Sequence, residues 1–303
     1  MAFDGIREEA VRDLSDLLAQ ATPDRPDPAS GRLRSRIVFR GIQRPDSRLL
    51  TSLDRLGTDE RPDLPYHSKI HLEEDLVRHF VRRAQGLLPK PVHSWWEALI
   101  LAQHHGLPTR LLDWTRSPLV AAHFATLGGL PGHDRVLWRL DWGEMQRHFG
   151  LSERAYTVLD LDGPTNLTQE AVNALDMWSR LREAEETGRH FAFLLEPPAL
   201  DARIVAQGGA FTVSSDPRRP LDELLLNEGL GHTLTRLVIP ADHVDLIRDQ
   251  LDLVNVTEGH LFPDLDGIAA EIRRWYAATP GEAARAPNPR TPDLSGGSTG
   301  GTT

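Results

Sequence analysis

The sequence predicts an α+β fold, with a mixed or antiparallel sheet core flanked by helices. Short runs rich in β-branched and aromatic residues alternate with longer stretches whose apolar residues recur at helical spacing. Their order lacks the regular strand–helix alternation that a doubly wound parallel sheet requires. With 303 residues, 40% of them hydrophobic, the chain can bury one large core or two modest ones.

The first predicted element is a helix over residues 4–20, because its apolar residues recur at helical spacing. A Pro- and Asp-rich link over 22–30 separates it from the rest of the chain. Residues 36–41, Arg-Ile-Val-Phe-Arg-Gly, predict a short strand that ends in a glycine turn. An apolar stripe then predicts a helix over 71–87.

The next helix has both of its ends marked in the sequence. Ser94, with Glu97 three residues later, predicts a capping box and a helix that runs through Gln103. Gly106 and Pro108 end this helix.

The remaining elements follow from the same signals. Residues 109–114 predict a strand, and Pro118 starts a helix over 119–126 because proline is favoured at the first helical position. Further strands are predicted at 135–140, 190–195, 203–213 and 235–239. Further helices are predicted at 168–186 and 262–277, with Pro263 in the first turn of the last.

Composition divides the chain into one folded body with two extensions. We expect an N-terminal helix and linker over residues 1–30, a single domain over 31–283, and a disordered tail over 284–303, which is rich in Pro, Gly, Ser and Thr. The N-terminus lacks the charged-then-apolar pattern of a signal peptide, and no apolar run approaches the roughly 20 residues that span a bilayer. We therefore expect a cytoplasmic protein without a membrane partner.

Charge and cysteine content exclude several classes of function. A net charge of −10 disfavours a broad basic surface for nucleic acid, although arginines cluster locally over 32–40. The chain has no cysteine, which excludes disulfides, thiolate metal sites and cysteine nucleophiles. The adjacent histidines 104 and 105 diverge by roughly 100° on a helix and fit no metal-ligand pattern, so no metal is expected.

Residues 103–115, Gln-His-His-Gly-Leu-Pro-Thr-Arg-Leu-Leu-Asp-Trp-Thr, carry the densest polar chemistry of the sequence. They lie between a predicted helix and a predicted strand, where a rigid scaffold holds polar groups at the edge of the core. Arg110 and Asp113, three apart in a strand, are expected to point to opposite faces.

Each candidate residue has a functional and a structural interpretation. Arg40, at a strand end, suits phosphate because its fork of donors matches two oxygens, but an ion pair with Asp113 is equally open. We expect His104 to be mainly a packing residue and leave both roles open for His105. For Asp113, a role in a functional site is ranked above a role as a helix cap. Ser117, in contrast, is expected to cap the following helix. Trp114 is the best candidate for stacking on a flat ring, although core burial is favoured.

Several of these residues carry a family resemblance. Phe39-Arg40-Gly41 and the 103–115 run resemble the FRG domain, a bacterial family named for its Phe-Arg-Gly motif. Further matches lie at 117–119 (Ser-Pro-Leu), 121–125 (Ala-Ala-His-Phe-Ala), 207–212 (Gln-Gly-Gly-Ala-Phe-Thr) and 261–267 (Leu-Phe-Pro-Asp-Leu-Asp-Gly). The resemblance covers roughly residues 37–276.

A more distant resemblance, to mono-ADP-ribosyltransferases, implies both a fold and a function. In that superfamily an arginine on the first strand binds NAD, a Ser/Thr-bearing strand supports the nicotinamide ribose, and a late glutamate stabilises the charge formed at the broken bond. By position, Arg40 would be the first element and Asp113-Trp114-Thr115 the second. Gln207 stands where the glutamate is expected, and a neutral amide stabilises an oxocarbenium ion less than a carboxylate does.

Three functions follow from these residues. The first is an NAD-consuming enzyme, a mono-ADP-ribosyltransferase or NAD glycohydrolase acting as a toxin or antiphage effector, with NAD as substrate and an unknown acceptor. Its predicted catalytic residues are Arg40, His105, Asp113 and Gln207. Its predicted NAD-binding residues are Arg40, Gly41, His104, Arg110, Trp114 and Thr115.

The second function is a non-catalytic nucleotide- or phosphate-binding module, which Gln207 favours. The third, a nuclease or phosphodiesterase, is disfavoured because no carboxylate pair suits two metals.

Overall fold

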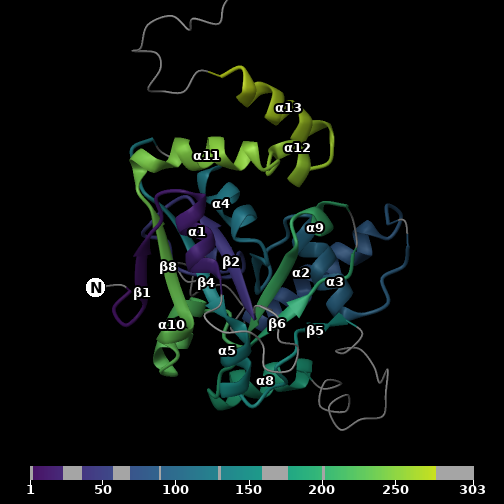
Figure 1. Cartoon of the computed structure of the whole chain (residues 1–303). Coiled ribbons are helices and arrows are strands. Elements are labelled where there is room, and N and C mark those ends of the chain that lie inside the picture. Colours follow the sequence, from purple (N-terminus) through teal and green to yellow (C-terminus); the bar gives the residue numbers. More distant parts are fainter. Residues whose placement is uncertain are drawn as a thin grey trace, which may run out of the picture.

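The computed structural model describes residues 3–22, 36–56, 69–88, 90–128, 131–158, 177–199 and 202–277. Within them the chain forms one mixed sheet of eight strands in the order β1-β8-β4-β2-β3-β7-β6-β5. β1 pairs with β8 and β5 with β6 in parallel, and the other neighbours are antiparallel. The predicted α+β class with a mixed sheet is confirmed (Figure 1).

The bounds of the elements are as follows. The strands are β1 (Arg7–Ala10), β2 (Ile37–Ile42), β3 (Leu111–Thr115), β4 (Arg135–Asp141), β5 (Tyr156–Thr157), β6 (Ala192–Glu196), β7 (Gly209–Ser214) and β8 (Leu234–Ile239). The α-helices are α1 (Leu14–Ala21), α2 (Lys69–Ala84), α3 (Trp95–His104), α4 (Pro118–Thr126), α5 (Trp142–His148), α8 (Met177–Thr187), α9 (Ala202–Ala206), α10 (Leu221–Asn227), α11 (Val244–Leu253), α12 (Glu258–Leu261) and α13 (Leu265–Trp275). Short 3-10 turns are η1 (Asp54–Leu56), η3 (Gly231–Thr233) and η4 (Ala241–His243).

Side-chain caps fix where several helices begin. Ser94 accepts a hydrogen bond from Glu97 N at the start of α3, and Ser117 does the same from Val120 N at the start of α4. Both predicted caps are confirmed. The Glu97 carboxylate accepts from His93 N, one residue before the cap, which departs slightly from the predicted capping box.

Three predicted elements were wrong in part. Residues 7–10, predicted as helix, form the edge strand β1, and the helix α1 starts only after the Asp13 cap. The predicted strand 203–213 divides into α9 and β7. The predicted helix 262–277 corresponds to α13 but begins later, because α13 starts at Leu265 and is capped by Asp264 rather than begun by Pro263. The predicted link 22–30, all but its first residue, residues 168–176 of a predicted helix, and the tail 284–303 lie outside the described residues.

The core is arranged in three clusters around the sheet. One face is covered continuously by α5 and α10, which pack on side chains such as Val38, Trp138 and Leu194. The other face is covered in two halves. The helices α1, α4 and α11 pack over Phe39 and its neighbours, and α2, α3 and α8 pack over β3, β7 and β6. The two halves meet where β2 lies beside β3.

No helix within the described ranges is long and apolar enough to cross a membrane.

Candidate functional site

The sheet opens between β2 and β3, at its centre. These two strands share a single residue pair, Phe39 opposite Thr115, whereas β2 and β4 pair over six residues. Beyond that pair the two strands diverge, and Arg40 is the first residue of β2 inside the opening. A cavity of about 660 Å³ lies there, a volume typical of small-molecule sites.

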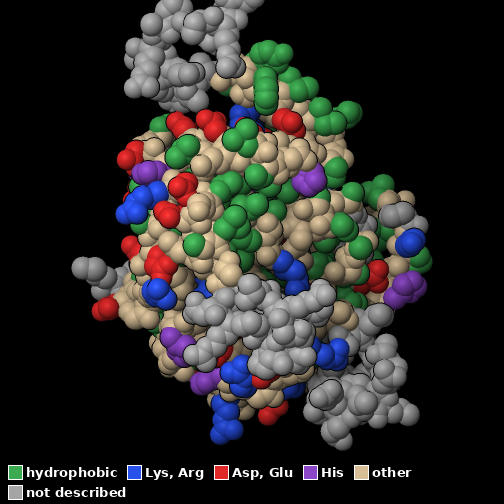
Figure 2. Space-filling model, viewed as in Figure 1, with side chains coloured by type: hydrophobic (Ala, Val, Ile, Leu, Met, Phe, Trp, Pro, Cys, Tyr) green, Lys and Arg blue, Asp and Glu red, His purple; other side chains and the backbone are tan. Residues whose placement is uncertain are grey.

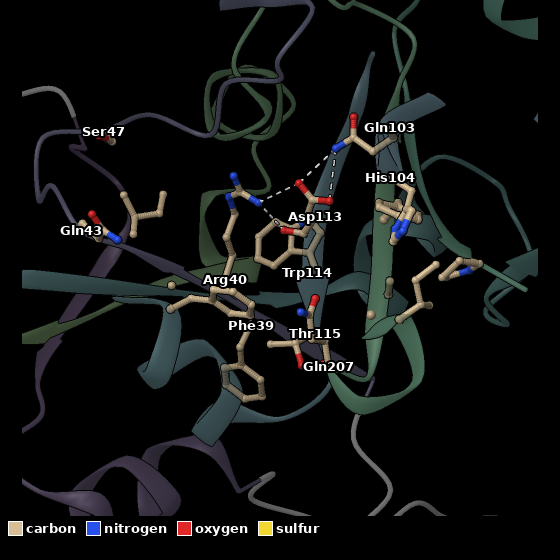
Figure 3. A pocket seen from close by; sticks show the side chains of 18 of the residues that line it. Phe39, Arg40, Gln43, Ser47, Gln103, His104, Asp113, Trp114, Thr115 and Gln207 are labelled. Atoms are coloured by element: carbon tan, nitrogen blue, oxygen red, sulfur yellow. Dashed lines mark hydrogen bonds and ion pairs between the residues drawn. The ribbon is translucent and has the colours of Figure 1, made fainter. Parts of the chain in front are cut away.

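Arg40 compensates for the backbone pairing that is lost in the opening. Its Nη1 atom donates to the main-chain oxygen of Asp113 at 2.6 Å and lies 3.5 Å from the Asp113 carboxylate (Figure 3). The Arg40 side chain is 20% exposed and that of Asp113 is 58% exposed. Burial lowers the pKa of Arg40, against the opposing effect of Asp113, and the nearby Arg55 lowers it further.

The Arg40 interactions decide between the two predicted roles only in part. The ion pair with Asp113 is present, but all of these contacts use the single atom Nη1. A guanidinium has five N–H donors, so most of the fork is not used by Asp113. Its Nε is buried and has no hydrogen-bond partner among the described residues. Because this buried Nε is not open to the cavity, the donors left for an anionic ligand are on the two terminal nitrogens of Arg40.

A chain of hydrogen bonds reaches Asp113 from the side opposite Arg40 (Figure 3). Gln103 Nε2 lies 3.2 Å from both carboxylate oxygens of Asp113. The hydroxyl of Thr109 donates to Gln103 Oε1 at 2.5 Å. Because Oε1 is occupied as an acceptor, the amide presents its NH₂ group to the carboxylate, as the geometry requires. Asp113 is thus held between Gln103 and Arg40.

The cavity lining is strongly basic. Five arginines line it, and Asp113 is the one acidic residue among the described residues of the lining. The arginines are Arg40, Arg44, Arg48, Arg55 and Arg203. Arg48 is anchored by the buried Asp222 and by Glu223, and Arg203 stacks over Phe262 with its guanidinium carbon 4.5 Å from the ring centre. In a chain of net charge −10, this concentration of arginine favours an anionic ligand.

Thr115 and Gln207 form the floor on the α9 side. The Thr115 hydroxyl donates to the main-chain oxygen of Gln207 at 2.6 Å. The Gln207 side-chain amide donates to the main-chain oxygen of Leu261 at 3.1 Å, which ties α12 to the cavity wall. Both residues line the cavity, and each uses its polar side chain as a donor to backbone.

Seven of the nine predicted site residues line this one cavity. They are Arg40, Gly41, His104, Asp113, Trp114, Thr115 and Gln207. His105 and Arg110 do not belong to the lining. His105 is exposed at the C-terminal end of α3, with its ring 6.0 Å from that of Phe80. The sequence analysis favoured packing for His104 and left a functional role open for His105, whereas in the structure His104 lines the cavity and His105 does not.

Arg110 belongs to the core. Its side chain is fully buried, and both its backbone N–H and its Nε donate to Glu73, at 2.6 and 2.5 Å. Its guanidinium carbon lies 5.0 Å from the ring centre of Trp178. The prediction that Arg110 binds NAD is wrong, because a buried carboxylate on α2 already holds it. Arg110 precedes β3 and contacts Glu73 of α2 and Trp178 of α8, on the side of the sheet from which Gln103 of α3 reaches Asp113, so the predicted opposite orientation of Arg110 and Asp113 is not confirmed.

Gly41 and Trp114 serve packing where the sequence predicted ligand contact. Gly41 lies within β2 and not in a turn, and a Cβ there would overlap the backbone of Ala121 and Ala125 in α4. Glycine is thus needed for α4 to approach the sheet. Trp114 is 3% exposed and donates from Nε1 to the Thr212 hydroxyl at 2.9 Å, so the favoured core role is confirmed.

The sequence interpretation missed several residues of the site. Gln103 and Thr109 stand in the predicted motif, but only the fold shows that they orient Asp113. Arg44, Arg48 and Arg55 come after β2 in the sequence and also line the cavity. The signal available in the sequence was this series of arginines, which follows a strand that contains a candidate site residue.

Comparison with known families supports part of the expected identity. Residues 35–131 match the family model of the FRG domain, so the chain contains an FRG domain in this segment. The match spans β2, α2, α3, β3 and α4, and includes Arg40, Gln103 and Asp113. No curated protein and no solved structure matches the chain.

A metal centre was not expected, and this stays a prediction. Over the part of the chain that the structure describes, no group of three or more His, Cys, Asp or Glu side chains could hold a metal ion.

Proposed function

We propose that the chain is an NAD-consuming enzyme, a mono-ADP-ribosyltransferase or NAD glycohydrolase, and that the cavity between β2 and β3 holds the dinucleotide. The observation that carries the proposal is the gathering of five arginines around one cavity in an acidic chain. A pyrophosphate is the anionic group that NAD offers to such a lining, and arginine forks bind phosphate oxygens in pairs.

The lining has an apolar part suited to the rings of a dinucleotide. Phe124, Ile204 and Phe211 lie on the same cavity as the arginines. The arginines at the end of β2 and after it would hold the phosphates, and the apolar side chains would contact the rings. A site with one polar and one apolar part favours a ligand that carries both kinds of surface.

Asp113 is the group that fits the chemical step. When the bond between nicotinamide and ribose breaks, nicotinamide leaves with the bonding electrons, and positive charge develops on the ribose. A carboxylate fixed in advance stabilises that charge without reorganisation. Water or another acceptor then forms the new bond to the ribose carbon and releases a proton. Gln103 and Arg40 hold Asp113 in place for this role.

A non-catalytic nucleotide-binding module is the second candidate. It is favoured by two observations: Asp113 already faces Arg40, and the Gln207 amide already donates to the backbone of Leu261. A carboxylate that is neutralised by an arginine stabilises a nearby cation less than a free carboxylate does. The same arginine-lined cavity would then bind a nucleotide without cleaving it.

The test is to incubate the purified chain with NAD and to follow free nicotinamide by chromatography. Wild type is expected to release nicotinamide, and Arg40→Ala and Asp113→Asn to lose this activity with an unchanged circular dichroism spectrum. Arg147→Ala, which removes an exposed arginine outside the cavity lining, is the matched control and should stay active.

A thermal-shift measurement with NAD separates the two candidates. A rise in melting temperature that Arg40→Ala abolishes, without nicotinamide release, supports the binding module. If NAD is not cleaved and does not raise the melting temperature, both candidates are contradicted. If the protein is an enzyme, its consumption of NAD inside a cell would make it a toxin or antiphage effector that acts in the cytoplasm.

A further inference from the structure

Helix α13 turns two of its polar side chains, Glu271 and Arg274, toward the protein. Arg274 donates to Asp252 at 2.6 Å and to Glu258 at 3.0 Å. Glu271 accepts from the Thr257 hydroxyl at 2.8 Å and from Gly259 N at 3.0 Å. These bonds attach one face of α13 to α11 and α12, so that its orientation on the molecule is fixed.

A close backbone contact fixes the start of the same helix. Gly267 is the one buried residue of α13, and a Cβ at this position would overlap the backbone oxygen of Phe262. The helix therefore cannot rotate to turn another residue inward without separating from α12. Its inner face is defined by Gly267, Glu271 and Arg274.

The outer face of α13 is apolar, which reverses the usual arrangement of a surface helix. Five large apolar side chains lie on it with half or more of their surface exposed. They are Leu265 (84% exposed), Ile268 (50%), Ile272 (55%), Trp275 (75%) and Tyr276 (84%). We call these five residues the α13 stripe. Figure 2 shows hydrophobic side chains projecting from this end of the molecule, over α13.

The spacing of the α13 stripe is that of a helix–helix contact. Leu265, Ile268, Ile272 and Trp275 are separated by three, four and three residues, which is the pattern of core positions in a two-helix seam. Leu253, 85% exposed at the end of α11, adds apolar surface next to Asp252, to which α13 is bound. Exposed apolar patches of this kind mark interaction surfaces.

The charges beside the stripe indicate which helix it would meet. Asp266 lies near the start of α13 and Arg273 near its end, and both side chains are exposed. Seven residues apart, they lie on the same flank of the helix, because two turns bring the chain back to within about 20°. In an antiparallel pair of identical helices, Asp266 of each copy would therefore lie on the side of Arg273 of the other.

We propose that the α13 stripe is a homodimer interface, in which α13 of two copies of this chain pair antiparallel across a two-fold axis. A two-fold interface must be self-complementary. The α13 stripe supplies the apolar side chains of such an interface. Asp266 and Arg273, beside the stripe, supply opposite charges near the two ends of the helix. The inference does not depend on the proposed enzymatic function.

The test is sedimentation equilibrium of the full chain over a range of micromolar concentrations. Wild type is expected to have twice the monomer mass, and Ile272→Glu the mass of a monomer. Leu87→Glu is the matched control, because Leu87 is 86% exposed but lies beside α2, and this variant should remain a dimer. Wild-type monomer at all concentrations overturns the proposal and assigns the stripe to another protein or to other residues of the chain.

A charge exchange tests the antiparallel arrangement. Asp266→Lys and Arg273→Glu are each expected to weaken the dimer by about tenfold, because each places like charges side by side. The double variant, Asp266→Lys with Arg273→Glu, restores opposite charges and is expected to restore the dimer. A dimer that survives Ile272→Glu, or a double variant that stays as weak as the single ones, overturns the arrangement.

Discussion

Replacing Glu73 by Gln tests the assignment of Arg110 to the core. In the native protein the Arg110 and Glu73 side chains are both fully buried, and the carboxylate holds Nε and the backbone N–H of Arg110. The substitution keeps the volume but removes the negative charge. It leaves a buried guanidinium without a counter-charge, whose Nη1 and Nη2 already lack hydrogen-bond partners among the described residues. Breaking one side of a buried pair costs about 3–5 kcal/mol of unfolding free energy.

The measurement is chemical denaturation of wild type and Glu73→Gln, with the slope of the transition compared to confirm that only stability has changed. Arg78→Ala is the control on the same helix, because Arg78 is 63% exposed and its pair with Glu74 is expected to contribute no more than about 1 kcal/mol. If Glu73→Gln unfolds at the wild-type denaturant concentration but loses stabilisation by NAD, the reasoning is refuted and Arg110 is a ligand-binding residue.

Three further predictions concern the site and its support. Gln103→Leu removes the amide that orients Asp113 and should slow nicotinamide release about tenfold; it should also lower the unfolding free energy by about 1–3 kcal/mol, because the buried Thr109 hydroxyl loses its acceptor. Burial and the neighbouring Arg248 lower the pKa of His123 to about 4, so the unfolded chain, with an ordinary histidine pKa near 6.5, takes up a proton first as the pH falls. Stability should therefore decline from about pH 6.5 to 4, and denaturation of His123→Gln should show a decline smaller by up to about 1.4 kcal/mol per pH unit. Gly41→Ala should cost about 1–3 kcal/mol or more in a denaturation experiment, since its methyl group meets α4; wild-type stability would show that α4 shifts freely.

Elements with strong local signals were predictable from the sequence. The caps at Ser94 and Ser117 are side-chain hydrogen bonds across three residues, so the sequence alone contains both partners. The strand around Arg40 is a buried apolar run. In contrast, residues 7–10 are mostly charged and exposed, and they form a strand only because β8, from the far end of the chain, offers them a parallel edge. No local pattern records that partner.

The division of 203–213 had a different cause. Its β-branched residues Ile204, Val205 and Val213 favour a strand, but Gly208 has a φ of +55°, in the left-handed region where helices commonly end. A glycine in such a run can mark a bulge within a strand or the end of a helix, and here Gly208 lies between α9 and β7 while Gly209 begins β7. The same residue type permits both structures, and packing decides between them.

The candidate site shows the same limit at the level of single side chains. The helical angle shows that His104 and His105 cannot face one pocket, but only the position of α2 decides that His105 lies near Phe80 and His104 lines the cavity. Arg40 and Arg110 are equally plausible phosphate ligands in sequence. Their roles differ because Glu73 reaches Arg110 from α2, a residue 37 positions away.

The opening between β2 and β3 gives a physical reason for an arginine at position 40. Where two strands separate, each leaves backbone groups without a partner, and an unsatisfied group costs free energy unless a side chain or water binds it. Arg40 satisfies the Asp113 carbonyl with one nitrogen and leaves the other donors of its two terminal nitrogens at the cavity. A lysine could donate from only one atom, which would have to serve both the carbonyl and a ligand. The same residue thus maintains the opening and supplies the charge for binding, so structural and functional interpretations of Arg40 are complementary.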